Sequence, residues 1–283
     1  MNLPRITVVT PSFNQVTYLP ETIKSVLNQN YPNLEYIIID GASTDGSVDI
    51  IKEYESHLSY WCSEKDAGQS DAIMKGFFKS TGELFAWVNS DDVLFPGSLN
   101  RIAQRYQQRK KPDIITGNVI YIDSEGKIRR FVRIPPQGRF FFYRGVWHVS
   151  APVVFFRSAL FREVGGLNLQ YHLCMDLDVW ARMMNANVRV AHIKEYMGGF
   201  RWHEASRSTA ASKKGSVCSH PEAVEIFSNY VPNYSARKLA LWRFLYKSYQ
   251  IVNLNYVRAH FHCKPVRGKE WWQVFPDDPS GSF

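Results

Sequence analysis

Cysteine is scarce in this sequence, and the few cysteines are not arranged as metal ligands. Cys62, Cys174, Cys218 and Cys263 lie far apart, and no two form a C-x-x-C pair. This spacing predicts neither a zinc site nor a disulfide framework, and it favours free thiols in a reducing compartment.

Long hydrophobic runs are also missing. No stretch approaches the roughly 20 consecutive apolar residues of a membrane span, and the first residues lead directly into a candidate strand. We therefore expect a protein that stays in the cytoplasm.

Acidic residues are outnumbered by basic ones. The 283 residues include 34 Lys and Arg against 26 Asp and Glu, which gives a net charge of +8. Such an excess suits phosphate groups, an acidic membrane surface or nucleic acid as a partner. No nucleic-acid-binding motif accompanies the charge, so we expect no nucleic-acid partner.

What the sequence does contain is an apolar run that ends in two adjacent carboxylates. Leu84–Val88 show no polar alternation, which is typical of a strand buried on both faces of a largely parallel sheet. Asp91 and Asp92 follow at its carboxyl end, where open α/β sheets bind ligands and where acids can hold a hard cation. Taken alone, Asn89–Asp92 fits equally well a polar turn that leads into a helix.

Strands and helices alternate in the segment before this run. The expected strands are Ile6–Thr10, Glu35–Asp40 and Leu58–Ser63. The order predicts right-handed crossovers, with the loops gathered at one edge of the sheet. Four acids then share that edge: Asp40, Asp66, Asp91 and Asp92. A single acid at a strand end is usually a cap or a turn former, but four in one crevice favour a ligand site.

Four segments in this order resemble the nucleotide-sugar half of the family 2 inverting glycosyltransferases. They are Thr10–Asn14, Asp40–Gly46, Glu64–Gly68 and Asn89–Asp92, and the similarity extends over residues 4–205. The resemblance implies the GT-A fold, a mixed α/β sheet flanked by helices, and a nucleotide-sugar donor. It also implies Mn²⁺ or Mg²⁺, because a diphosphate beside carboxylates needs a cation with oxygen ligands between them.

The resemblance also assigns roles to residues. Asp40 would contact the nucleobase above the Thr10–Ser12 loop, and Asp91 and Asp92 would hold the ribose and the metal, with Asp92 as the principal metal ligand. The full set of nucleotide-binding candidates is Thr10, Pro11, Ser12, Asn14, Asp40, Asp66, Gly68 and Asp91. Many relatives have Asp where Asn89 stands, so the metal site should carry less charge here.

A second cluster of acids begins a predicted helix. Asp176 and Asp178 lie where the helix dipole favours acids, so helix capping accounts for them as well as chemistry does. The segment resembles the acceptor site of the family, in which the acid matching Asp176 is the general base. We expect Asp178 to be structural or supporting, and Met175 departs from the Glu of many relatives.

Further candidates lie in two other stretches. Arg201–Arg207 resembles a segment that folds over the donor diphosphate, with His203 as a metal ligand and Arg201 or Arg207 against phosphate. A lone histidine is more often simply packed or hydrogen-bonded. Trp147 and His148 belong to an aromatic, basic region that could stack on an acceptor sugar or lipid, or could equally belong to the core.

The sequence divides into an expected catalytic domain and a tail. We place the catalytic domain at 1–215, with a nucleotide-sugar half at 1–97 and an acceptor half at 98–215, and a mainly helical extension at 216–283. The helix expected at Ala236–Asn253 is apolar on more than one face and carries basic residues. Docking onto the domain is slightly favoured over peripheral contact with an anionic membrane at its inner face.

The residues and the resemblance together predict an inverting glycosyltransferase. It would move a sugar from a nucleotide diphosphate sugar, preferably a UDP-sugar, to a hydroxyl of a saccharide or lipid-linked acceptor. Two alternatives stay open. A sugar nucleotidyltransferase would normally have a Gly-rich basic loop where Thr10–Asn14 stands. A non-catalytic nucleotide-sugar-binding module is suggested by Asn89 and Met175.

Overall fold

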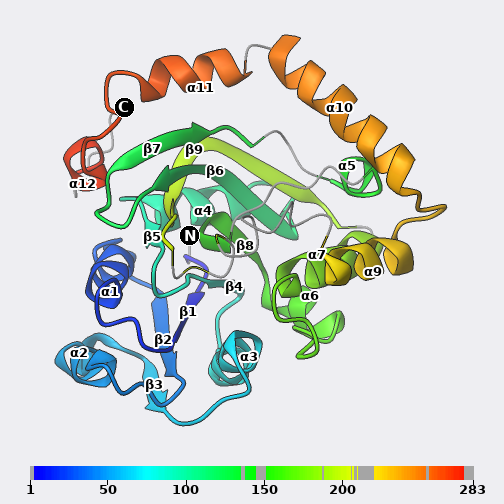
Figure 1. Ribbon diagram of the computed structural model, residues 1–283. Helices are drawn as coiled ribbons and strands as arrows, with labels where there is room; N and C mark the ends of the chain where they lie inside the picture. The colour runs from blue at the N-terminus through cyan, green and yellow to red at the C-terminus, as the bar shows by residue number, and fades with distance from the viewer. Residues whose placement is uncertain are drawn as a thin grey trace.

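The computed structural model describes residues 3–134, 138–144, 151–186, 188–204, 206, 209, 220–252 and 255–276. Its described strands form one mixed sheet in the order β3-β2-β1-β4-β8-β6-β9-β5, with β7 paired to β6 (Figure 1). The strands are β1 (Ile6–Ser12), β2 (Leu34–Asp40), β3 (Tyr60–Ser63), β4 (Leu84–Trp87), β5 (Val93–Leu94), β6 (Ile114–Ile122), β7 (Ile128–Val132), β8 (Val154–Arg157) and β9 (Val190–Arg201).

Helices cover both faces of the sheet and continue into the C-terminal region. They are α1 (Leu19–Leu27), α2 (Ser47–Glu53), α3 (Gln69–Lys79), α4 (Ser98–Tyr106), α5 (Arg139–Phe142), α6 (Ser158–Glu163), α7 (Met175–Asn185), α9 (Pro221–Tyr230), α10 (Ala236–Val252), α11 (Asn255–Cys263) and α12 (Trp271–Val274). The predicted α/β sheet flanked by helices, with a helical C-terminal part, is therefore confirmed.

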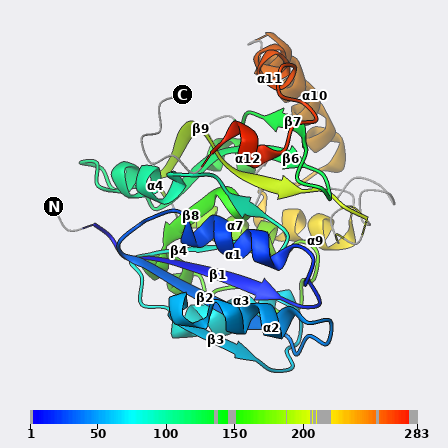
Figure 2. The same ribbon diagram turned by 90° about the vertical axis from the view of Figure 1, so that its left-hand side faces the viewer.

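The first four strands form the parallel part of the sheet. β1 pairs in parallel with both β2 and β4, and β2 pairs with β3. Every residue of β1 and β4 is buried, because helices lie on both faces, as Figure 2 shows. Parallel pairing brings the carboxyl ends of these strands to one edge, where a ligand crevice is expected.

Side-chain alternation along the strands divides the core into two layers. On one face Val8, Ile38 and Ala86 pack with residues of α1, α2 and α4. On the other face Val9 and Trp87 pack with residues of α3, α6, α7 and α9. Because successive strand residues point to opposite faces, a continuous apolar run can fill both layers.

The second half of the sheet is mixed. β8 pairs antiparallel with β4 and with β6, and β7 forms a hairpin with β6. β6 is one continuous strand with a register irregularity between Thr116 and Val119. A turn in which the Gly126 N–H donates to Asp123 O at 3.1 Å precedes β7.

Two strands were not predicted from the sequence. β9 runs parallel to β6, and β5 follows Asp92 and pairs antiparallel with β9. Gly198 and Gly199 permit this pairing, since a Cβ atom there would come within 2.6 Å of Val93 O and 2.8 Å of Val93 Cγ2, respectively. The pairing brings the end of β9 to the two acids that follow β4.

Two of the C-terminal helices pack against elements of the region 98–215. α9 lies on α7, and α11 lies on β7, where Ala259 and Cys263 are buried. No helix in the described parts of the chain is both long and apolar enough to cross a bilayer.

Candidate functional site

A pocket of about 770 Å³ lies at the carboxyl ends of β1, β2 and β4. This volume falls within the usual range for small-molecule sites. The residues that line it come from loops far apart in the sequence: Pro11, Ser12, Phe13, Gln15, Gly41, Ala42, Lys65, Asp66, Gly68, Gln69, Ala72, Asn89, Ser90, Asp91, Phe200 and Ser206. The fold thus brings the four segments of the sequence motif to one cavity.

The loop after β1 forms one wall of the pocket. The Ser12 hydroxyl is buried without a hydrogen-bond partner among the residues that the structure describes, and Phe13 is 59% exposed. Thr10 does not line the cavity, because its hydroxyl pairs with Tyr36 Oη at 3.0 Å inside the core. A ring and an unpaired hydroxyl at this wall are groups that a planar polar ligand can contact.

Asn14 ties this loop to the loop after β2. Its φ of 51° is left-handed, a conformation that Asn tolerates better than most residues. Its N–H donates to Ser43 Oγ at 2.8 Å, and its Oδ1 accepts from the Thr44 N–H at 3.0 Å. Asn14 therefore shapes the pocket without lining it.

Asp40 is fully buried and does not line the pocket. Its carboxylate accepts the Ser43 N–H at 2.8 Å, the Ser43 hydroxyl at 2.5 Å and the Ser63 hydroxyl at 2.7 Å. These bonds join the ends of β2 and β3. Asp40 is placed to hold the loop rather than to face a ligand in this conformation.

Asp66 reaches the cavity from the loop after β3. Its Oδ1 accepts the Gly68 N–H at 2.8 Å, and Oδ2 lies 2.7 Å from where a Cβ of residue 41 would stand. Gly41 is therefore required for Asp66 to approach. Gly68 lines the same wall with a φ of 109°. Lys65 is the single Lys or Arg among the described lining residues, and no role was predicted for it from the sequence.

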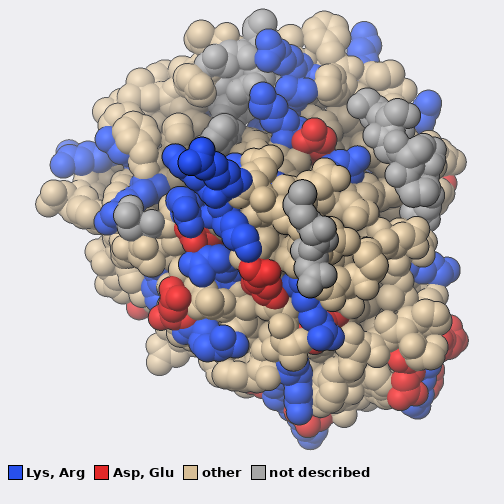
Figure 3. All heavy atoms as spheres, turned by 180° about the vertical axis from the view of Figure 1, so that it is seen from behind, with Lys and Arg blue, Asp and Glu red and all other residues tan. Residues whose placement is uncertain are grey.

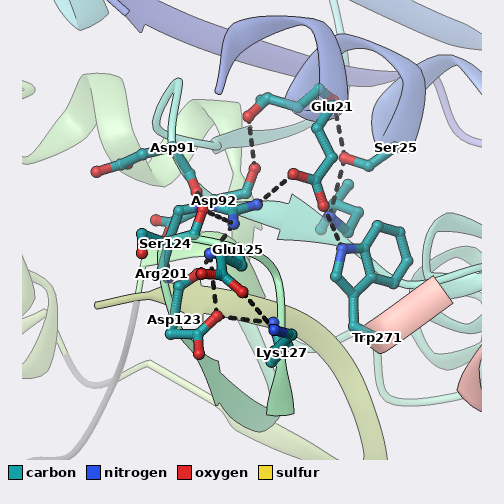
Figure 4. A network of polar contacts seen from close by, with 12 residues as sticks. Glu21, Ser25, Asp91, Asp92, Asp123, Ser124, Glu125, Lys127, Arg201 and Trp271 are labelled. Atoms are coloured by element: carbon teal, nitrogen blue, oxygen red, sulfur yellow. Dashed lines mark hydrogen bonds and ion pairs between the residues drawn. The ribbon is translucent and has the colours of Figure 1, made fainter. Parts of the chain in front are cut away.

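Asp91 and Asp92 differ sharply in environment (Figure 4). Asp91 lines the pocket, whereas Asp92 is 1% exposed. Asp92 accepts the Arg201 N–H at 2.9 Å and the Asn89 side-chain amide at 3.0 Å. Burial, and after it the Asp91 carboxylate, raise the pKa of Asp92 well above its ordinary value, although these hydrogen bonds oppose the shift.

Arg201 is the centre of a buried network rather than a free cation. Its side chain is 1% exposed, and Nε donates to Asp91 O at 2.8 Å. Its two terminal nitrogens bond to Asp123 O at 3.0 Å and to Glu21 Oε2 at 2.5 Å. Glu21 also accepts the indole N–H of Trp271 in α12. Arg201 thus connects the loop of Asp91 and Asp92 to α1 and to the β6–β7 turn.

His203 follows the end of β9 and lies beside Asp91. Its Nε2 is 2.9 Å from Asp91 Oδ2, and its ring packs on Tyr18 with centroids 4.7 Å apart. The ring is largely buried and therefore held in place. His203 does not itself line the pocket, but it contacts a carboxylate that does, and carboxylates and imidazoles are both ligands that Mn²⁺ accepts.

The two acids of α7 also have different environments. Asp178 is buried and pairs with Arg182 at 2.6 Å, a structural contact within the helix. Asp176 is partly buried, and its Oδ1 accepts the Leu177 N–H at 2.7 Å. Burial raises the pKa of Asp176 to about 6, and this hydrogen bond opposes the shift. A carboxyl group with such a pKa is suited to proton transfer near neutral pH.

The start of α7 contacts α3 on one side and α9 on the other. The Ser70 hydroxyl of α3 contacts the Met175 sulfur at 2.8 Å, one residue from Gln69 in the pocket wall. From α9, Glu222 accepts the N–H groups of His172, Leu173 and Cys174 at 3.2, 3.0 and 2.8 Å. Sequence reasoning missed Glu222, because no motif links it to α7.

Glu222 also belongs to a small group of potential metal ligands. In the described part of the chain, ligand atoms of Cys174, His220 and Glu222 lie within 4.8 Å of one another. The Glu222 carboxylate already accepts three N–H groups, so we assign it a structural role. Three other predicted site residues, Trp147, His148 and Arg207, lie outside the described residues.

Comparison with known proteins gives relatives along most of the chain. TuaG of Bacillus subtilis, named as a teichuronic acid biosynthesis glycosyltransferase, is 31% identical over 47% of this chain and 54% of its own length. The chain therefore matches about half of that relative. A PGL/p-HBAD biosynthesis glycosyltransferase of Mycobacterium bovis is 27% identical over 63% of this chain and 69% of its own length.

Solved structures share the fold at low sequence identity. S. aureus TarS 1–349 in complex with UDP is 16% identical, with a TM-score of 0.62 over 95% of this chain and 77% of TarS. The mannosyltransferase PcManGT of Pyrobaculum calidifontis, solved with GDP-Man and Mn²⁺, is 17% identical, with a TM-score of 0.55 over 75% of this chain and 61% of PcManGT. Residues 7–165, more than half of the chain, match Glycosyl transferase family 2. The chain therefore belongs to glycosyltransferase family 2 and has the GT-A type of fold.

Proposed function

We propose that the protein transfers a sugar from a UDP-sugar to an acceptor hydroxyl with inversion at the anomeric carbon. The observation that carries this proposal is the pocket in which Asp66 stands at one wall and Asp91, whose carboxylate contacts the buried His203, stands at another. A nucleoside diphosphate has a polar base at one end and anionic phosphates at the other. The UDP-GlcNAc complex of TarS, a neighbour of the same fold, supports this donor class.

The nucleoside end of the donor is assigned to the walls formed by the loops after β1 and β3. Phe13 offers a ring for the base, and Asp66 and the Ser12 hydroxyl offer hydrogen bonds to the base or the ribose. Asp40 supports this wall through Ser43 and Ser63. Lys65 is the cation that can balance phosphate charge.

A divalent cation fits the opposite wall. Asp91 and His203 would hold Mn²⁺ or Mg²⁺ beside the donor diphosphate. Asp92 supports this wall from inside the protein, because its oxygens already accept hydrogen bonds from Arg201 and Asn89. When bound, such an ion supplies Lewis-acid stabilisation of the leaving diphosphate.

Asp176 is the proposed general base. Its carboxylate accepts the proton of the acceptor hydroxyl as the oxygen attacks the anomeric carbon from the side opposite the diphosphate. The new glycosidic bond forms while the bond from the anomeric carbon to the phosphate oxygen breaks, and the nucleoside diphosphate leaves with the electron pair. A single displacement inverts the anomeric configuration, and Asp178 supports the helix through Arg182.

The acceptor is proposed to be a saccharide or a lipid-linked saccharide. The relatives named for teichuronic acid and PGL/p-HBAD biosynthesis support this class. We place the reaction in the cytoplasm, at the inner face of the membrane where the acceptor is lipid-linked.

Two measurements test this function. UDP with Mn²⁺ should raise the melting temperature, since a ligand at a hundred times its Kd adds about 2.7 kcal/mol of stability. A panel of nucleotide sugars should then give slow hydrolysis or transfer, with the product of opposite anomeric configuration. Metal-dependent UDP binding without turnover on any donor would instead identify a non-catalytic binding module, for which Asn89 and Met175 are the supporting observations.

A further inference from the structure

The excess positive charge of this chain lies in one segment. Residues 226–269 contain eight Lys or Arg residues and no Asp or Glu, which leaves 26 basic and 26 acidic residues in the rest of the chain. This segment includes α10 and α11. Figure 3, the view from behind, shows that Lys and Arg also predominate over acids in the upper part of the face it draws.

α10 has a buried face and an exposed apolar face. Leu239 and Tyr246, seven residues apart, are buried and turn toward the domain. The ring of Trp242 is contacted by the Arg144 guanidinium at 4.7 Å. A helix turns once in about 3.6 residues, so residues three and four positions apart share a face. The face opposite Leu239 and Tyr246 is therefore formed by Leu241, Phe244, Leu245, Ser248, Ile251 and Val252.

The apolar side chains of this outward face are exposed to solvent. Phe244 is 66% exposed and Val252 is 78% exposed, and Phe261 of the neighbouring α11 is 65% exposed. Lys238 and Lys247 fall on the two borders of the outward face of α10 and are exposed. An apolar stripe bordered by lysines is the pattern of a helix that lies in a membrane interface.

We propose that the outward face of α10 binds the surface of an anionic lipid bilayer. The apolar side chains would enter the boundary between headgroups and acyl chains, and the basic residues would lie at the level of the negative headgroups. An acid-free segment favours this occupant over a second copy of the chain, because two such faces brought together would repel each other.

This surface adjoins the half of the protein to which the acceptor is assigned. Phe141 of α5 contacts Tyr246 of α10 with ring centroids 6.1 Å apart, and α5 packs on α7, which carries Asp176. Membrane binding is inferred from the surface itself and goes beyond the proposed transfer reaction. It can be measured without donor or acceptor.

Vesicle co-sedimentation of the full chain tests the proposal. Wild type should bind phosphatidylglycerol vesicles, bind phosphatidylcholine vesicles at least tenfold more weakly, and lose affinity as salt rises. The variant Leu241→Gln/Phe244→Gln/Ile251→Gln should lose at least tenfold in affinity. Lys238→Gln/Lys247→Gln should bind more weakly and with a smaller salt dependence.

Two controls keep the proposal falsifiable. Phe78→Gln removes an equally exposed ring from α3, 76% exposed, and should bind vesicles like wild type. Each variant must keep the melting temperature of wild type, and if the triple variant does not, Phe244→Gln alone replaces it. Unchanged vesicle binding in the triple variant overturns the proposal, as does an equal loss in Phe78→Gln. A wild-type dimer in sedimentation velocity that the triple variant abolishes, with no vesicle binding, would assign the face to a second copy instead.

Discussion

His203 Nε2 lies 2.9 Å from Asp91 Oδ2, although the two residues are 112 positions apart in the sequence. β5 and β9 create this proximity, because their pairing places the end of β9 over the loop after β4. Asp91 is thus part of the pocket and has an imidazole partner, while its neighbour Asp92 is enclosed by Arg201 and Asn89.

The first prediction separates these two acids. Asp91→Asn should lower the Mn²⁺-dependent affinity for UDP at least tenfold, because a hard-cation site loses its charged ligand. Asp92→Asn should keep metal-dependent binding close to wild type. Calorimetric titration of UDP with and without Mn²⁺ measures both. If Asp92→Asn loses the metal dependence and Asp91→Asn keeps it, Asp92 is the principal ligand, as the sequence alone suggested.

The strands that carry the site could be predicted from the sequence, because each is a short run rich in apolar and β-branched or aromatic residues and is followed by turn residues. Val190–Arg201 could not, since it mixes charged and apolar residues and contains Gly198 and Gly199, which usually weaken strands. Here the missing side chains make room for Val93 of β5.

Motif matching also could not decide which acids line the pocket. Adjacent residues such as Asp91 and Asp92 point in different directions, and their surroundings depend on contacts with β9. Asp40 and Asp66 likewise fall in the same motif set, yet only Asp66 of the two lines the described pocket. The role of Glu222 depends on packing between α9 and α7, for which the sequence contains no local signal.

The second prediction concerns the nucleoside end of the pocket. Asp66→Asn should weaken UDP binding with or without metal, because the changed group faces the ligand while the fold loses little. Asp40→Ala should mainly reduce stability, by about 1 kcal/mol for each hydrogen bond to Ser43 or Ser63 that is lost. Urea unfolding and metal-free UMP titration compare the two variants. A stable Asp40→Ala protein with lost UMP affinity would return Asp40 to the base pocket.

The third prediction concerns Glu222 as a positioning residue for Asp176. Burial raises the pKa of Glu222, but the N–H groups of Cys174, His172 and Leu173 outweigh this and hold that pKa below its usual value. Its contribution to stability should therefore be present at neutral pH and be lost as the pH falls through the lowered pKa. Glu222→Gln should reduce kcat with little change in donor affinity, because the entry to α7 loosens while the pocket stays intact.

Glu225→Gln is the matched control for this variant. Glu225 lies on the same helix and, among the described residues, accepts a hydrogen bond from Tyr171 Oη at 3.1 Å rather than from the N–H groups at the entry to α7. Steady-state kinetics of both variants give kcat and KM for donor and acceptor. Equal kcat losses in the two variants would indicate general loosening of α9 instead of a specific effect on Asp176.

The fourth prediction tests Asp176 as the base through its pH dependence. The pKa of Asp176 is raised to about 6, so the carboxylate that accepts the proton forms as the pH rises through 6. We expect kcat of wild type to rise over this range and to level off above it. Asp176→Asn should lose about 100- to 10,000-fold in kcat, with UDP affinity near wild type.

The same pKa fixes the expected effect on stability. An acid whose pKa is raised on folding stabilises the fold at low pH and loses that contribution as the pH rises through the folded-state value. Asp176→Asn should therefore melt no lower than wild type at neutral pH, which separates lost chemistry from lost structure. Asp178→Asn, which breaks the ion pair with Arg182, should lower the melting temperature. If instead Asp178→Asn loses turnover at unchanged stability while Asp176→Asn retains it, the base is Asp178.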